Sequence, residues 1–199
     1  MGLPIHIVAA VTTNDIVYRT VNSGDYSLSK EVIPTLAPSM DIQVPYNMER
    51  ILLLSGQNKE DIVNHMHQFE KTGSATVPPD ILTNINTRIS SFVANDELIK
   101  QTMRKCWNEN QYLICPHTAT AVAYYYSQLE KKRNVKCVCF ATASPAKFAE
   151  AVLAAGLTPQ PTKAVTELES KPTRYIDMPS GADWEAMLRA KIEKISRKS

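Results

Sequence analysis

Short apolar runs rich in β-branched residues alternate with segments that have the features of helices, and this alternation limits the possible folds most strongly. Residues 3–11 and 90–94 have the composition of buried strands. Each run is followed by a polar residue that favours a helix start, Asp15 after the first and Asn95 after the second. Strands that alternate with helices are typical of layered proteins with a mostly parallel sheet. The sequence therefore predicts an α/β fold.

The same patterns divide the rest of the chain. Beyond the two runs above, we expect a third buried strand at residues 135–141 and an extended segment at 112–115. Helices are expected at residues 16–24, 46–54, 59–71, 95–107, 118–132, 145–156 and 183–195, with a short one after Pro78. Several of them stop at a glycine, which favours the left-handed conformation of a helix end. Segments 25–40 and 159–172 are rich in Ser, Thr or Pro and are predicted to be loops.

Length, charge and hydropathy disfavour several classes of protein. The chain has 199 residues, which suits one ordinary domain or two small ones. The net charge of +2 supplies no basic surface for nucleic acid or anionic membrane. No apolar run approaches the roughly 20 residues that cross a bilayer. The first residues match neither a signal peptide nor a lipidation motif, and the four cysteines do not suggest a disulfide framework. We therefore expect a cytoplasmic protein. We expect no membrane or nucleic-acid partner.

Two other kinds of site are disfavoured. The six glycines are too far apart to form a glycine-rich loop around a phosphate group. His65 and His67 are two residues apart in an expected helix, and their side chains therefore diverge. Cys137 and Cys139 lie in an expected buried strand, where a structural role is favoured over metal binding. We therefore expect no metal site.

Two polar segments remain as candidate sites. His117 lies between an extended segment and a helix, a position where α/β sheets bind ligands, although a helix cap explains it equally well. Cys115 with His117 is a weaker candidate for a nucleophile pair. Residues 35–50 bring hydroxyls, an amide and Arg50 together near a helix start, which suits a phosphate or carboxylate group. The alternative is a capped helix with Arg50 paired to Glu49 or to another acidic neighbour.

These motifs occur together in one known family. The ordered motifs are Asn14-Asp15, Gly24-Asp25-Tyr26, residues 35–42, Asn47-x-Glu49-Arg50, residues 116–119 and residues 141–148. In this order they resemble the threonine synthase family, and within it the animal branch of threonine synthase-like proteins. The resemblance is strongest over residues 1–157, whereas residues 158–199 form a loop and a closing helix.

The resemblance implies a three-layer α/β architecture, part of the type II fold of pyridoxal-phosphate enzymes, with the cofactor between two layers. Family members are much longer, and Met1 corresponds to a point past their middle. The fold is therefore expected to be truncated at its amino-terminal side. The lysine that forms the Schiff base and the loop that holds the cofactor phosphate belong to the preceding part. We expect no catalytic residue in this chain, and we do not expect it to bind pyridoxal 5'-phosphate by itself.

The resemblance also assigns residues on the far side of the site. Thr118 corresponds to the hydroxyl that bonds the pyridine nitrogen of the cofactor. Ser39, Asp41, Asn47 and Arg50 correspond to the substrate side, where a phosphorylated amino acid such as O-phosphothreonine or O-phosphohomoserine binds.

The reaction implied is that of a phospho-lyase, which converts such a substrate to a 2-oxo acid, ammonia and phosphate. Thr12, Ala121 and Ser144 stand where threonine synthases more often have Asn, Gly and His, and these departures disfavour the synthase outcome. We expect the chain alone to be inactive. The alternative is a truncated, non-catalytic interaction or signalling protein, which self-associates through an exposed sheet edge at residues 3–11.

Overall fold

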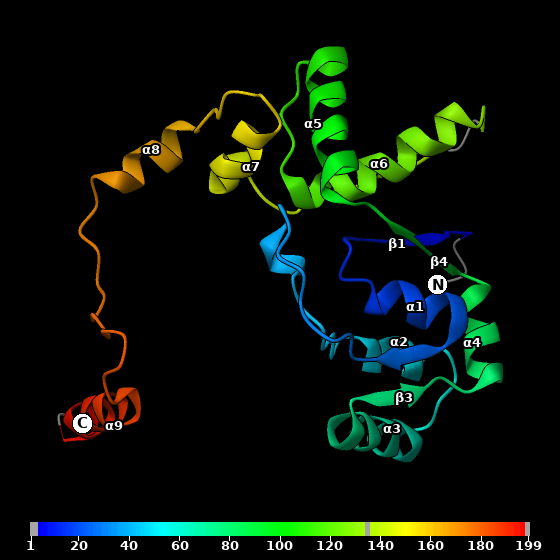
Figure 1. Ribbon diagram of the computed structural model, residues 1–199, viewed down its shortest axis with the longest axis horizontal. Coiled ribbons are helices and arrows are strands. Elements are labelled where there is room, and N and C mark those ends of the chain that lie inside the picture. The colour runs from blue at the N-terminus through cyan, green and yellow to red at the C-terminus, as the bar shows by residue number, and fades with distance from the viewer. Residues whose placement is uncertain (1–3, 134–135, 198–199) are drawn as a thin grey trace. The chain divides into compact units, whose positions relative to one another are not determined.

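The computed structural model describes residues 4–133 and 136–197. The chain divides into two compact units, Met1–Thr162 and Lys163–Ser199, and each is described by itself. Along the described part of the first unit the elements are β1 (Ile7–Val11), α1 (Ile16–Ser23), β2 (Asp25–Ser27), the 3-10 helix η1 (Pro38–Met40), α2 (Met48–Leu54), α3 (Lys59–Thr72), β3 (Ser74–Thr76), α4 (Pro79–Asn86), β4 (Ile89–Val93), α5 (Asp96–Asn110), α6 (Pro116–Glu130), the 3-10 helix η2 (Pro145–Phe148) and α7 (Ala149–Ala154) (Figure 1).

The strands form two small pairs. β1 and β4 are parallel, with Ile7 opposite Ile89 and Val11 opposite Val93. β2 and β3 are antiparallel. In Figure 1, α5 and α6 lie on one side of the β1–β4 pair, and α1, α2 and α4 lie on the other. The prediction of a layered α/β protein is thus confirmed.

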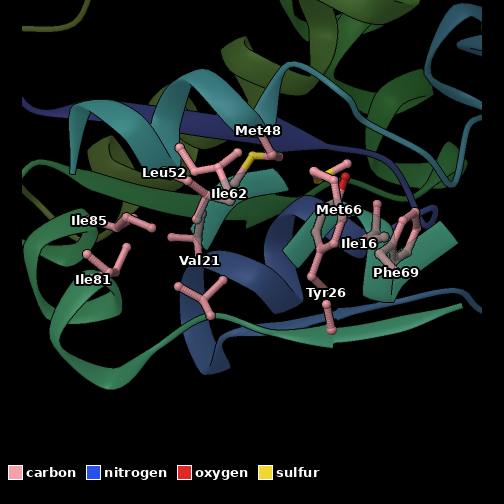
Figure 2. Close-up of a cluster of buried hydrophobic side chains, with 12 residues drawn as sticks. Ile16, Val21, Tyr26, Met48, Leu52, Ile62, Met66, Phe69, Ile81 and Ile85 are labelled. Carbon is pink, nitrogen blue, oxygen red and sulfur yellow. The ribbon is translucent and has the colours of Figure 1, made fainter. Parts of the chain in front are cut away.

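Two separate hydrophobic cores hold the first unit together. The first core lies among α1, α2, α3, α4 and the β2–β3 pair, and its larger members are Ile16, Val21, Tyr26, Met48, Leu52, Ile62, Met66, Phe69, Ile81 and Ile85 (Figure 2). The second core lies mainly among α5, α6 and α7, and its larger members are Ile99, Met103, Leu113, Ile114 and Val152. Burial of apolar surface at about 25 cal/mol per Å² makes both cores the main source of stability. The second core fixes the start of α6.

Helix ends follow local chemistry. The Asn58 side chain accepts a hydrogen bond from the Asp61 amide at the start of α3, and the Asn95 side chain accepts one from the Leu98 amide at the start of α5. Gly24 ends α1 in the left-handed region, with φ of 75°. A Cβ atom there would lie 3.2 Å from the Val77 carbonyl oxygen, so glycine is needed for space as well as for conformation.

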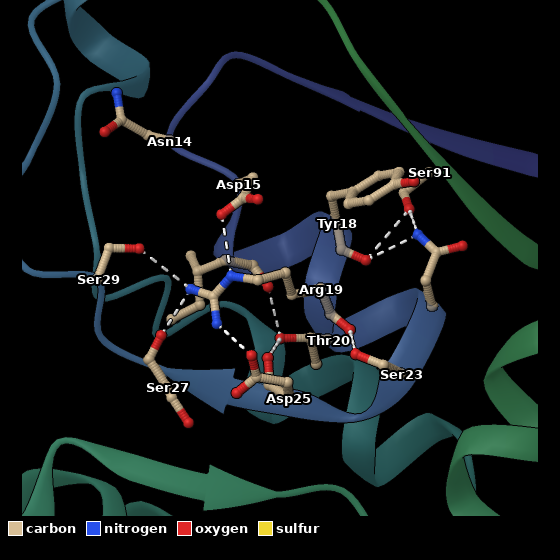
Figure 3. A network of polar contacts seen from close by, with 12 residues as sticks. Asn14, Asp15, Tyr18, Arg19, Thr20, Ser23, Asp25, Ser27, Ser29 and Ser91 are labelled. Atoms are coloured by element: carbon tan, nitrogen blue, oxygen red, sulfur yellow. Dashed lines mark hydrogen bonds and ion pairs between the residues drawn. The ribbon is translucent and has the colours of Figure 1, made fainter.

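Arg19 joins α1 to β2 and to the segment after it (Figure 3). Its guanidinium donates to the Asp15 and Asp25 carboxylates and to the Ser27 carbonyl oxygen, and it lies 3.4 Å from the Ser29 hydroxyl. A side-chain hydrogen bond between Ser27 and Asp25 lowers the pKa of Asp25. The hydrogen bond and the charge of Arg19 lower it further, so it lies below its ordinary value. The turn between α1 and β2 is therefore fixed by charge-assisted hydrogen bonds.

Three local predictions were wrong. Residues 136–141 are not a strand: Val138 is 85% exposed and Phe140 is 81% exposed. Val135, the first residue of that prediction, lies outside the described residues. An apolar run becomes a strand only when another strand supplies its hydrogen bonds, and none pairs with it in the part of the chain that the structure describes. The expected loop at 25–40 contains β2 and η1, and the expected loop at 159–172 contains the helix α8 (Lys163–Glu169).

The second unit contains α8 and α9 (Trp184–Ser196). Through residue 197, where its description ends, no residue of this unit is buried. Ile176 and Met178 lie with the α9 residues Met187 and Leu188 around a shallow apolar groove of about 380 Å³. Across residues 4–133 and 136–197, no helix is both long and apolar enough to cross a membrane.

Candidate functional site

The candidate site lies at the amino end of α6, where the chain leaves the second core. Leu113, Ile114 and Cys115 are buried, and Cys115 caps the helix because its sulfur accepts a hydrogen bond from the Thr118 amide at 3.4 Å. Pro116 occupies the first helical position, where its missing N–H group costs nothing. The helix therefore begins two residues before Thr118, the expected first residue, and the hydroxyl of Thr118 is held in its first turn.

The Thr118 hydroxyl is buried and is surrounded by polar groups. Only 4% of the residue is exposed. Its oxygen accepts a hydrogen bond from the Thr142 amide at 3.2 Å and lies 3.1 Å from the Cys115 sulfur. The residue expected to face the cofactor is thus fixed by two neighbours, one of them on the segment that precedes η2.

His117 connects this helix start to the segment expected to face the substrate. Its Nε2 atom accepts a hydrogen bond from the Ser39 amide at 3.2 Å. The imidazole packs on the Phe148 ring, with the ring centroids 4.5 Å apart and an angle of 50° between the planes. Burial and the charge of Lys147 lower the pKa of His117, whereas Asp41 acts in the opposite direction. His117 therefore links the segment that carries Ser39 to the start of α6, the helix that carries Thr118.

Asp41 closes the turn that follows η1. One carboxylate oxygen accepts hydrogen bonds from the Thr35 hydroxyl at 2.6 Å and from the Asn14 side chain at 3.0 Å. The other oxygen accepts the Thr35 amide at 2.9 Å. Much of the acceptor capacity of this carboxylate is therefore used to fold its own segment.

Asn47 and Arg50 lie at the start of α2, and both are exposed. Asn47 occupies the N-cap position but its side chain makes no capping hydrogen bond. Within residues 4–133 and 136–197, the Arg50 guanidinium has no hydrogen bond or ion pair, so the alternative in which it pairs with an acidic neighbour is not observed. No hydrogen bond in the described residues connects this pair to Ser39 or Thr118. Both side chains are available to a ligand.

Three further residues shape the site, and the sequence analysis gave none of them a role in it. Asn14 bonds both the amide and the carbonyl group of Ile33. Asp96 accepts the Leu36 amide at 3.0 Å. Thr142 supplies its amide to Thr118. No local pattern shows which distant amide a carboxylate such as that of Asp96 bonds.

The other candidate clusters do not assemble. In the described residues no hydrogen bond joins Cys115 to His117, because the imidazole bonds Ser39 and the sulfur bonds Thr118. His65 is buried, and burial lowers its pKa, whereas His67 is exposed. The parts of the chain that the structure describes contain no group of three or more His, Cys, Asp or Glu side chains that could hold a metal ion.

Comparison with known proteins agrees with this architecture. Residues 118–190 match the family described as "Threonine synthase, C-terminal". Threonine synthase-like 2 of Homo sapiens is 50% identical over 200 residues, which cover 99% of this chain and 41% of the relative. The chain thus spans about two fifths of the length of the curated relatives it matches.

Solved structures give the same result at the level of the fold. The crystal structure of threonine synthase from yeast superposes with a TM-score of 0.84 and 27% identity over 99% of this chain and 43% of that one. The structure of threonine synthase from Brucella melitensis with bound PLP (pyridoxal 5'-phosphate) superposes with a TM-score of 0.78 and 30% identity over 89% of this chain and 38% of that one.

The described fold is accordingly part of the type II fold of pyridoxal-phosphate-dependent enzymes, truncated relative to those structures. Within this class of enzymes, sequence similarity points to one family. The chain is similar along its whole length to threonine synthase-like 2, and its residues 118–190 match the carboxyl-terminal part of the threonine synthase family.

Proposed function

We propose that the chain is part of a pyridoxal-phosphate-dependent phospho-lyase that acts on O-phosphothreonine or O-phosphohomoserine and releases a 2-oxo acid, ammonia and phosphate. Its relation to threonine synthase-like 2 along the whole chain supports this proposal. The observation that carries it is the hydrogen bond between His117 and Ser39, because this bond joins the expected cofactor side and the expected substrate side.

Thr118 suits the pyridine nitrogen of the cofactor. Its oxygen accepts the Thr142 amide and lies 3.1 Å from the Cys115 sulfur, where either group can donate. When the thiol donates, the hydroxyl proton is available for an acceptor such as a ring nitrogen. A neutral hydroxyl leaves that nitrogen less protonated than a carboxylate would, which moderates the electron-withdrawing strength of the ring. When bound, pyridoxal phosphate supplies an electron sink for the carbanion formed at the substrate Cα atom. The role of Thr118 is to fix the ring orientation.

Asn47 and Arg50 suit the phosphate group of the substrate. The Arg50 guanidinium carries two parallel N–H donors that match phosphate oxygens, and the Asn47 amide adds a neutral donor. Because neither side chain is engaged within the described residues, neither must break a contact to bind. In this proposal Asp41 orients the segment that carries Ser39, and the Ser39 hydroxyl faces the substrate.

By itself, the chain is proposed to be inactive, because the resemblance places the Schiff-base lysine and the phosphate loop in another part of the family sequence. A second candidate function is that of a non-catalytic interaction protein. The observation that favours it is the exposure of apolar side chains near β1, where Ile5 is 63% exposed and Ile7 is 53% exposed. Such a surface favours self-association or a partner.

Phosphate release from O-phosphothreonine tests the proposal in a longer parent protein that carries this chain. Arg50→Gln is expected to raise KM about 10- to 100-fold, because a charge-assisted contact to phosphate is lost, with a smaller effect on kcat. The matched control is Arg88→Gln, which alters an exposed arginine on the turn before β4. An unchanged KM in Arg50→Gln would contradict the substrate assignment.

The same assay on the 199-residue chain, with added pyridoxal phosphate and borohydride trapping, is expected to give neither phosphate nor a stoichiometric lysine adduct. A single mapped adduct with phosphate release would show that a lysine of this chain does the chemistry. Inactivity of the longer parent together with a concentration-dependent oligomer of the chain would favour the interaction role.

A further inference from the structure

Residues 33–41 are held by their own turns and by side chains of other segments, without strand pairing. Apart from η1, this segment has no helix or strand. Three of its amides donate to distant side chains, and the pairs are Ile33 with Asn14, Leu36 with Asp96, and Ser39 with His117. Their acceptors come from the turn after β1 and from the first turns of α5 and α6. The segment is therefore fixed in one conformation before any ligand binds.

We propose that His117 is a positioning residue: its neutral imidazole holds the Ser39 amide, and thereby the Ser39 side chain, beside Thr118. This proposal rests on the proposed function, because Ser39 and Thr118 are its expected substrate-facing and cofactor-facing groups. His117 itself need not touch the substrate. Its effect on the reaction is exerted through Ser39.

The imidazole is well fixed for this task. The first turn of α6 holds its backbone, and the Thr120 hydroxyl donates to the His117 carbonyl oxygen at 2.8 Å. Phe148 of η2 packs against the ring. The Nδ1 atom is buried and has no hydrogen-bond partner among the described residues. The Ser39 amide is thus the one hydrogen bond that the described residues give to the ring.

The bond requires the neutral form of histidine. Nε2 can accept the Ser39 N–H only while it carries no proton, so the proton of the neutral ring must lie on Nδ1. Two charged groups act on the ring, Lys147 of η2 and Asp41 after η1. Burial and Lys147 lower the pKa of His117, and Asp41 opposes them. A lowered pKa favours the neutral ring at pH 7, which is the form that the bond requires.

Acid should release Ser39 selectively. A group whose pKa is lowered in the folded protein stabilises that state above its unfolded pKa, about 6.5 for histidine. As the pH falls below that value, the released state binds the proton more readily, and the bond is lost. The acceptors of Ile33 and Leu36 are an amide and a carboxylate, and neither is an imidazole. Release is thus expected at Ser39 before it occurs at the other two amides.

Amide hydrogen exchange of the full 199-residue chain tests this inference without any cofactor. The measured quantity is the exchange rate of Ser39 relative to Leu36, corrected for the intrinsic pH dependence. His117→Phe keeps the ring packing on Phe148 but removes the acceptor, and it is expected to raise the ratio about three- to tenfold at pH 7. His117→Gln supplies a carbonyl acceptor and is expected to restore at least part of the protection.

Measuring the exchange ratio at several pH values distinguishes a role of His117 in holding Ser39 from a role in packing alone. In the wild type the ratio is expected to rise between pH 7 and 5, whereas in His117→Gln it should stay constant. An unchanged ratio in His117→Phe, or a wild-type ratio that does not vary with pH, would overturn the inference. If His117→Phe also loses the protection of Leu36, the substitution has unfolded the segment, and the wild-type pH series then decides.

Kinetics of the longer parent distinguish this inference from the proposed function. His117→Phe should raise KM for O-phosphothreonine about tenfold. In the wild type, KM should also rise between pH 7 and 5 as Ser39 is released, and in His117→Gln this rise should be absent. If exchange behaves as expected but the parent releases no phosphate, His117 still holds Ser39 and the proposed function is wrong. If the parent is active and KM is unaffected by His117→Phe, the positioning role is wrong.

Discussion

Arg19 connects α1, β2 and the following segment through one planar group. Its guanidinium donates hydrogen bonds to two carboxylates and a carbonyl oxygen at the same time (Figure 3). Its side chain is 23% exposed, and Asp15 and Asp25 are 35% and 41% exposed, so solvent screens the ion pairs in part. The planar geometry of the guanidinium therefore contributes more to stability than the charge alone. Lysine has the charge but not the geometry.

Arg19→Lys is expected to reduce the free energy of unfolding by about 1–2 kcal/mol, because one ammonium cannot satisfy three separated acceptors. Urea denaturation monitored by circular dichroism measures the change. Arg88→Lys makes the same exchange at an exposed arginine and should stay within about 0.5 kcal/mol of the wild type. Equal effects of the two substitutions would show that the Arg19 network contributes no more than an exposed charge.

At the scale of elements, the three asparagines that precede helices differ in their bonding. The Asn58 and Asn95 side chains cap α3 and α5, whereas the Asn47 side chain does not cap α2. We expect Asn58→Ala and Asn95→Ala each to lower the free energy of unfolding by about 1 kcal/mol, and Asn47→Ala to lower it by less than about 0.5 kcal/mol. Urea unfolding of the three variants measures the differences. A loss of 1 kcal/mol in Asn47→Ala would mean that Asn47 has a structural role and is not free for a ligand.

Some helix boundaries were predictable because their signals are local. Asn95 and Gly73 lie within a few residues of the amides and carbonyl groups that they serve, so the sequence alone locates the start of α5 and the end of α3. The strand at residues 135–141 failed for the opposite reason. Its apolar composition is local, but the hydrogen bonds that define a strand come from elsewhere in the fold.

The candidate site was only partly predictable for the same reason. The resemblance supplied Ser39 and Thr118, and their roles remain predictions. The bond between Ser39 and His117 joins residues 78 positions apart. The pairing of Leu36 with Asp96 spans 60 positions. A pattern within one segment contains no information about such partners, because the packing of α5 and α6 against the rest of the unit brings them together.

At the scale of the whole molecule, the two units differ in how they are stabilised. Residues 1–162 contain both hydrophobic cores, whereas residues 163–197 contain no buried side chain. In the second unit α9 has 13 residues and a single polar cap, the Asp183 side chain, which accepts from the Ala186 amide. Isolated helices shorter than about 12–15 residues are marginal in water, so local interactions alone do not stabilise α9.

We therefore expect the fragment 1–162 to fold by itself and to unfold cooperatively in urea, because both hydrophobic cores lie within its boundaries. A peptide of residues 163–199 is expected to be less than about one third helical at 25 °C. Circular dichroism of the two fragments measures both properties, and helix-promoting trifluoroethanol provides a positive control for the peptide. A strongly helical peptide would show that α8 and α9 are stabilised within the second unit. A broad, non-cooperative transition of the fragment 1–162 would show that its two cores are not sufficient for a native state.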